Sequence, residues 1–76
     1  MKRKIDVKVG DTVELVYTND ELTKLRKGDR GVITSIEGEP GDRVFHIKWY
    51  NGDSLALLEE VDEFKIIKKR FNDLTL

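Results

Sequence analysis

The fold is decided by two stretches, Lys8-Val-Gly-Asp-Thr-Val-Glu-Leu-Val-Tyr17 and Leu25-Arg-Lys-Gly-Asp-Arg-Gly-Val-Ile-Thr-Ser-Ile36, each of which places a Gly-Asp step before an apolar run. In the first stretch, Val13, Leu15 and Tyr17 fall on one face, which is the period of a half-buried strand. A turn followed by a strand, used twice, indicates a small β-barrel.

The second strand is predicted over residues 31–37 and should bend. Ile33 and Ile36 are three residues apart, so a strict period of two requires a bulge or a sharp twist between them. The polar segment before this strand is predicted to be a long loop pinned by Leu22 and Leu25, with a single helical turn as the alternative.

Two hairpins follow in the sequence. Turn residues fill positions 38–42, and residues 43–49 then alternate in hydrophobicity as a third strand. Asn51-Gly52 favours a two-residue type I′ turn, after which residues 54–58 continue as a fourth strand. Residues 59–63 are expected to form a short helical turn before a fifth strand.

We therefore predict an all-β, five-stranded SH3-like barrel with a basic N-terminal arm at 1–8, the barrel at 9–67 and a C-terminal tail at 68–76. Ile67, Phe71 and Leu74 have the i, i+4, i+7 spacing of a short C-terminal helix. The expected core consists of Val13, Leu15, Ile33, Ile36, Phe45, Ile47, Leu55, Leu57, Phe64 and Ile66.

Composition restricts the function further. The chain has 76 residues, enough for one domain, and it has no cysteine and one histidine, so neither a disulfide framework nor a metal or other cofactor site is expected. Its 14 basic and 15 acidic residues nearly cancel. No apolar run is long enough for a membrane span. We expect a cytoplasmic protein that is a monomer or a weak homodimer and does not bind membranes.

The order of strands, loops and turns resembles an SH3-like barrel, and the segment around Lys27-Gly-Asp-Arg-Gly31 resembles the KOW element of ribosomal and transcription-elongation proteins. The chain is also similar, over residues 9–67, to a family of short uncharacterised phage and plasmid proteins. The residues that carry this likeness are Gly28 to Gly31, Val44 to Trp49, Asn51, Gly52, Ser54, Leu55, Leu57, Asp62 and Phe64. That family often has an acidic residue after the tryptophan, where this chain has Tyr50.

Candidate catalytic groups are lacking in the sequence pattern, so no enzymatic activity is expected. No serine or threonine sits in a nucleophile elbow, and no second histidine offers a relay to His46. Trp49 is interpreted as a core residue and His46 as a solvated one. The glycines around Asp29 lack the end of a phosphate-binding P-loop and are interpreted as a tight entry into the second strand.

Two binding functions remain open. The first is a protein-interaction or adaptor module with an unknown partner, in which the long loop, the turn tips and the apolar tail residues Phe71, Leu74 and Leu76 make contacts. The second is a KOW-like nucleic-acid-binding protein, since basic and aromatic side chains together bind single strands. The surface predicted for the nucleic acid or the partner comprises Tyr17, Lys24, Arg26, Lys27, Arg30, Lys48 and Tyr50.

Overall fold

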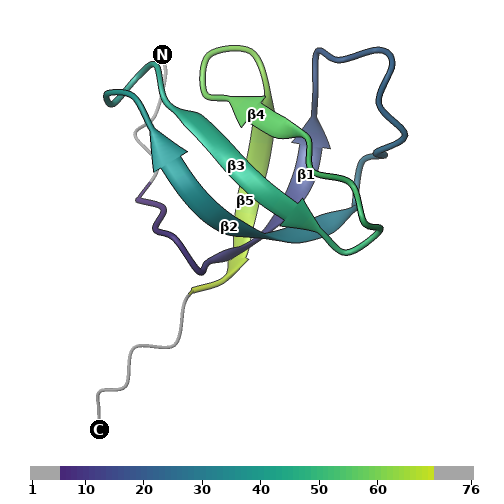
Figure 1. The fold of residues 1–76 in the computed structure, drawn as a ribbon, viewed down its shortest axis with the longest axis horizontal. Helices are drawn as coiled ribbons and strands as arrows, with labels where there is room; N and C mark the ends of the chain where they lie inside the picture. The colour runs from purple at the N-terminus through teal and green to yellow at the C-terminus, as the bar shows by residue number, and fades with distance from the viewer. Residues whose placement is uncertain (1–5, 70–76) are drawn as a thin grey trace, which may run out of the picture.

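The computed structural model describes residues 6–69 of the chain. Its five strands are β1 (Thr12–Tyr17), β2 (Arg30–Glu37), β3 (Val44–Trp49), β4 (Ala56–Leu58) and β5 (Glu63–Lys68). They form one antiparallel sheet in the order β4-β3-β2-β1-β5, so that β5 returns beside β1 and the edges are β4 and β5 (Figure 1). The predicted all-β fold with five strands is confirmed.

No helix occurs within residues 6–69. The helical turn expected near residue 60 is a hydrogen-bonded turn, in which Asp62 N donates to Leu58 O at 2.9 Å. The expected C-terminal helix lies outside the described residues.

A Gly-Asp turn starts β1. Lys8 N donates to Asp11 Oδ2 at 2.8 Å, and Asp11 N donates back to Lys8 O at 3.0 Å. Gly10 lies between them with a φ of 100°, close to the value that the third position of a type II turn requires and that favours glycine. The side chain and the backbone of one aspartate therefore close the same four-residue turn.

A second turn with the same bonds starts β2. Arg26 N donates to Asp29 Oδ2 at 2.8 Å, Asp29 N donates to Arg26 O at 2.9 Å, and Gly28 has a φ of 99°. The interpretation of these glycines as a tight entry into the second strand is confirmed.

The two turns extend opposite ends of the β1–β2 ladder. In the first turn the glycine N donates to Ile33 O and the aspartate O accepts from Ile33 N, at 2.8 and 3.0 Å. In the second turn the glycine N donates to Leu15 O and the aspartate O accepts from Leu15 N, at 2.9 and 2.8 Å. An offset of 18 residues therefore superposes one turn and strand on the other. The two halves are related by an approximate twofold axis through the middle of the ladder, where Val13 lies opposite Gly31.

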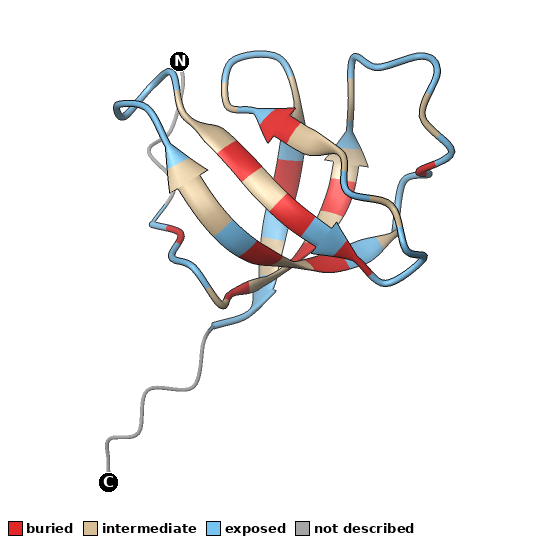
Figure 2. Ribbon diagram, viewed as in Figure 1, coloured by how far each residue is buried: buried red, intermediate tan, exposed pale blue. Residues whose placement is uncertain are grey.

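A buried apolar residue precedes each turn, Val7 in the first case and Leu25 in the second. Sequence reasoning assigned Val7 to the basic arm and did not place it in the core. The ten predicted core residues are buried or, for Ile36, Leu55 and Ile66, packed in part against the core (Figure 2). Trp49 is buried as predicted, and its Nε1 donates to Leu55 O at 2.9 Å.

The bend predicted for the second strand is confirmed, because the β2–β3 register shifts between Ile33 and Ser35. The prediction of a two-residue type I′ turn at Asn51-Gly52 is wrong. Trp49 N donates to Asp53 O at 3.1 Å and its O accepts from Gly52 N at 3.0 Å, which encloses a three-residue loop. This is the hairpin in which a glycine with positive φ forms a bulge, and β4 begins only at Ala56.

We predict that Gly31→Ala lowers the free energy of unfolding by about 1–3 kcal/mol, the usual cost of overpacking. A Cβ at this position would lie 2.6 Å from Ile47 Cγ2 and 2.8 Å from Lys48 O, and a backbone atom cannot rotate away. Urea unfolding monitored by Trp49 fluorescence measures the change. The exposed control Lys48→Ala should stay within about 0.5 kcal/mol of the parent. Equal stability of both variants would contradict the packing argument.

Candidate functional site

Three connections gather at one end of the sheet: the β1–β2 loop, the β2–β3 loop and the β4–β5 turn (Figure 1). We call this the loop end and define it as residues 18–29, 38–43 and 59–62. Hydrogen bonds tie the β4–β5 turn to each of the other two connections. The surfaces of the three connections are therefore held in fixed positions relative to one another.

Asp62 holds the β1–β2 loop against the β4–β5 turn. Its Oδ1 accepts from Thr18 Oγ1 at 3.0 Å and from Asn19 N at 2.6 Å, while its Oδ2 accepts from Leu58 N at 2.8 Å. Bonds from three donors to a carboxylate restrain all the groups involved. The start of the long loop is thus fixed by a residue more than 40 positions away in the sequence.

The same loop presents Leu22 to solvent. Asp20 N donates to Thr18 Oγ1 at 3.2 Å, and Asp20 Oδ1 accepts from Leu22 N at 2.9 Å in an Asx turn. Leu25 is buried, as the pinned-loop prediction requires, but Leu22 is 94% exposed, so the prediction is wrong for Leu22. A large apolar side chain therefore projects from a loop that side-chain hydrogen bonds hold in place.

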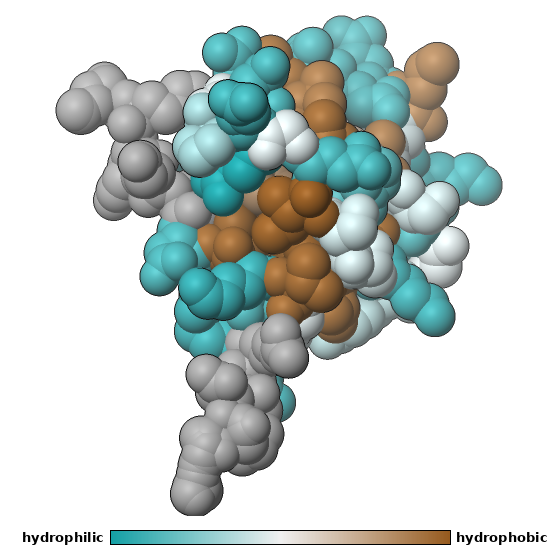
Figure 3. Space-filling model, turned by 60° about the vertical axis from the view of Figure 1, so that its left-hand side comes forward, coloured by the Kyte–Doolittle hydropathy of each residue, from teal (hydrophilic) through white to brown (hydrophobic). Residues whose placement is uncertain are grey.

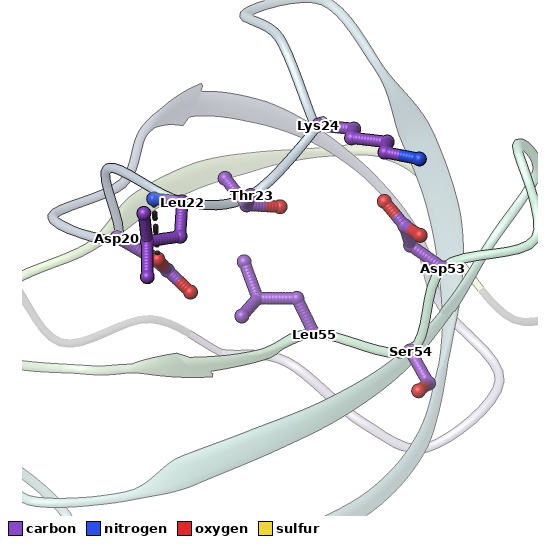
Figure 4. A pocket seen from close by; sticks show the side chains of 7 residues that line it. All are labelled: Asp20, Leu22, Thr23, Lys24, Asp53, Ser54 and Leu55. Carbon is purple, nitrogen blue, oxygen red and sulfur yellow. Dashed lines mark hydrogen bonds between the residues drawn. The ribbon is translucent and has the colours of Figure 1, made fainter.

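An open groove of about 380 Å³ lies between this loop and the segment that leads into β4. Leu22 and Asp20 stand at one end, Lys24 and Asp53 stand at the other, and Leu55 projects between the two walls (Figure 4). The residues that line the groove are Asp20, Leu22, Thr23, Lys24, Asp53, Ser54 and Leu55. It combines the apolar side chains of two leucines with two carboxylates and one ammonium group.

A bidentate ion pair joins the β2–β3 loop to the β4–β5 turn. Arg43 Nε and Nη2 donate to Glu59 Oε1 and Oε2 at 2.9 and 3.0 Å, and Gly41 N also donates to Glu59 Oε1 at 3.0 Å. The guanidinium stacks 5.1 Å from the centre of the Phe45 ring. The hydrogen bond from Arg43 is the main reason that the pKa of Glu59 falls to about 2, and the same bond raises the pKa of Arg43.

Three members of the predicted basic and aromatic surface lie together on the sheet. Tyr50 N donates to Arg30 O at 2.8 Å, and Lys48 is two residues before Tyr50 on the same face. Arg30 is paired with Glu14 at 3.1 Å, and the same carboxylate lies 3.7 Å from Lys65 Nζ. Part of the positive charge of this face is therefore neutralised from within the sheet.

The other predicted members lie elsewhere. Lys24 lines the groove, and Arg26 Nη1 donates to the carbonyl oxygens of Lys24 and Leu25 at 3.3 and 3.2 Å. Lys27 belongs to the second Gly-Asp turn. Tyr17 is 53% exposed at the far end of β1, beyond a register shift that interrupts the expected alternation with Leu15. The predicted tail contacts Phe71, Leu74 and Leu76 lie outside the described residues.

Sequence reasoning missed both the groove and its supports. Asp20 and Asp53 carried no pattern that distinguished them from other acidic loop residues. Glu59 and Asp62 were placed in the predicted turn at residues 59–63, and Asp62 also among the residues of the family likeness, but their bonds were missed because the partners are distant in the sequence. Among described residues, no three acidic or histidine side chains group in a way that could hold a metal ion. Within the same residues no helix could cross a membrane.

Other exposed apolar side chains lie outside the groove lining: Val9, Tyr17, Tyr50, Leu58, Val61 and Ile67. Figure 3 shows one face on which hydrophobic side chains gather at the centre and hydrophilic ones surround them. Apolar patches bordered by polar residues are typical of interaction surfaces.

The fold and the groove together define a small all-β domain with an open surface groove. The chain belongs to the family described as a domain of unknown function, DUF4314, whose model matches residues 3–67. Searches of curated proteins and of solved structures found no match.

We predict that Asp62→Ala releases the start of the β1–β2 loop. Loss of one buried or half-buried acceptor costs about 1–3 kcal/mol, so the free energy of unfolding should fall by that amount. Amide hydrogen exchange should accelerate at Asn19 and Leu58, which lose their acceptor. The neighbouring control Glu60→Ala should leave both amides protected. Unchanged exchange in Asp62→Ala would show that the loop is held by other contacts.

The pKa of Glu59 also predicts a pH dependence. A carboxyl whose pKa is lower in the folded state contributes stability above its unfolded pKa, and this contribution is lost as the pH falls. With a folded pKa of about 2, Glu59 should contribute roughly 3 kcal/mol that disappears between about pH 5 and pH 2. Urea unfolding of the parent and of Glu59→Gln at pH 7, 4 and 2.5 tests this. The stability gap should shrink towards acidic pH; a constant gap would contradict the assignment.

Proposed function

We propose that the protein is a non-enzymatic protein-interaction module built on an SH3-like barrel. The strand order, the long β1–β2 loop, the bulged β2 and the turn before β5 support an SH3-like assignment. The observation that carries the interaction function is the 94% exposure of Leu22 on a restrained loop beside a groove.

Both the exposure of Leu22 and the restraint of its loop favour binding to a partner. Burying a fully exposed leucine gains about 1.5–3 kcal/mol, which an isolated monomer forgoes. Binding through a mobile loop loses part of such a gain to the ordering of the chain. Here Asp62 and Asp20 already hold the backbone on the N-terminal side of Leu22. The loop is thus pre-organised to place an apolar contact against a partner.

A second candidate is KOW-like binding of single-stranded nucleic acid. The observation in its favour is that Arg30, Lys48 and Tyr50 lie together on one face of the sheet, where cations could contact phosphates and the ring could stack on a base. The pairing of Arg30 with Glu14 and the separation of Tyr17 from this face weaken it. The interaction module is therefore preferred.

One experiment compares the two functions. A photo-crosslinking amino acid is placed at position 22 or at position 48 in the full-length protein, and each variant is irradiated in its native host. We expect a discrete adduct from position 22 that protease removes and nuclease does not. Both positions are exposed, so neither substitution should disturb the fold.

The second arm measures fluorescence anisotropy with labelled single-stranded RNA, single-stranded DNA and duplex DNA at two salt concentrations. We expect no salt-sensitive binding. A nuclease-sensitive adduct from position 48, together with micromolar binding that Arg30→Glu and Lys48→Glu abolish, would replace the proposed function with the nucleic-acid one.

A further inference from the structure

We propose that the groove binds an extended peptide segment of a partner protein, with an apolar side chain between Leu22 and Leu55 and basic side chains beside the carboxylates at the groove ends. This inference rests on the proposed function and names the chemistry of the partner.

Two leucines make part of the groove lining apolar. Leu22 supplies an exposed wall and Leu55 a half-buried one, while Thr23 and Ser54 add hydroxyl groups to the lining. The volume of about 380 Å³ lies within the range of about 300–1,000 Å³ typical of small-ligand sites. The groove is largely open to solvent, which suits a chain that enters and leaves rather than an enclosed small molecule.

The charged groups of the lining favour a basic partner. Asp20 and Asp53 lie at opposite ends of the groove, and Lys24 is its one basic lining residue. The loop end, whose β1–β2 part lines the groove, carries eight carboxylates against four basic side chains, a formal net charge of minus four in a chain whose total is minus one. Its acidic residues are Asp20, Glu21, Asp29, Glu39, Asp42, Glu59, Glu60 and Asp62, and its basic residues are Lys24, Arg26, Lys27 and Arg43.

The negative charge of the loop end favours some partners of the groove over others. A concentration of one sign of charge attracts and orients an oppositely charged partner over distances beyond direct contact. It disfavours nucleic acid, whose phosphates would approach the carboxylates. The clamps made by Asp62 and by Glu59 hold the three charged connections together, so the negative potential keeps a fixed position next to Leu22.

The test uses defined probes. Three labelled peptides are titrated into ¹⁵N-labelled protein: Ser-Lys-Arg-Leu-Lys-Ser, its acidic counterpart Ser-Glu-Asp-Leu-Glu-Ser, and the leucine-free Ser-Lys-Arg-Ser-Lys-Ser. We expect the first peptide to shift the amide signals of Leu22, Thr23, Ser54 and Leu55. The other two should bind at least about tenfold more weakly, since each lacks one part of the recognition.

Variants assign the binding to the groove. Leu22→Ser should weaken the first peptide about tenfold without altering the fold, because the side chain is 94% exposed. The matched control Val9→Ser removes an exposed apolar side chain from the first Gly-Asp turn and should leave the affinity unchanged. Asp20→Asn with Asp53→Asn keeps the side-chain oxygens and should reduce both the affinity and its dependence on salt.

Each remaining outcome overturns the inference. Equal binding of the acidic peptide would contradict the proposed preference for basic side chains. Signal shifts confined to other amides would show that the peptide binds outside the groove. Concentration-dependent self-association that Leu22→Ser abolishes identifies a second copy of the chain as the occupant. If no peptide binds but position 22 still gives a protein adduct, the partner chemistry is wrong and the proposed function stands. If position 22 gives no protein adduct, the proposed function fails as well.

Discussion

The structure depends on one repeated interaction: in each Gly-Asp turn, the aspartate side chain accepts a hydrogen bond from the backbone N–H three residues earlier. A carboxylate withdrawn from water is tolerated only when donors replace its hydration, and Asp11, which is fully buried, receives both Lys8 N and Lys69 Nζ. The same turn points its glycine N–H and aspartate carbonyl at the facing strand. Each aspartate thereby sets the start, direction and register of a strand together.

Carboxylates of the β4–β5 turn also stabilise the loop end, where they join connections to one another and do not start strands. Asp62 and Glu59 accept several hydrogen bonds each and join connections that lie far apart in the sequence. The stability that such bonds provide depends on leaving no donor unpaired, so their removal costs more than their presence gains. Aspartates at the strand starts determine the sheet, and acids at the loop end determine the surface that the sheet displays.

The sequence predicts features that depend on neighbours along the chain and misses those that depend on distant contacts. The three-residue spacing of Ile33 and Ile36 was sufficient to predict the bulge in β2. The alternating hydrophobicity of β3 was sufficient to predict the burial of Trp49. Leu22 and Leu25 have the same local pattern, and only the turn at Asp20 separates an exposed leucine from a buried one. Asn-Gly occurs in hairpin loops of two and of three residues, and the pairing of β3 with β4 decides between them. The site was hidden for the same reason, since the partners of Asp62 are 43 and 44 residues away.

The approximate twofold relation between residues 7–15 and 25–33 has a consequence for how the domain can change. The segment that carries Leu22 lies between the two related units, and each unit sets its own strand register through its own turn. Insertions or replacements in that segment therefore need not propagate into the sheet, since loop-closure entropy rises slowly with length. The exposed loop surface and the strand register are encoded in separable parts of the chain, so the loop can change in sequence and length while the architecture stays constant.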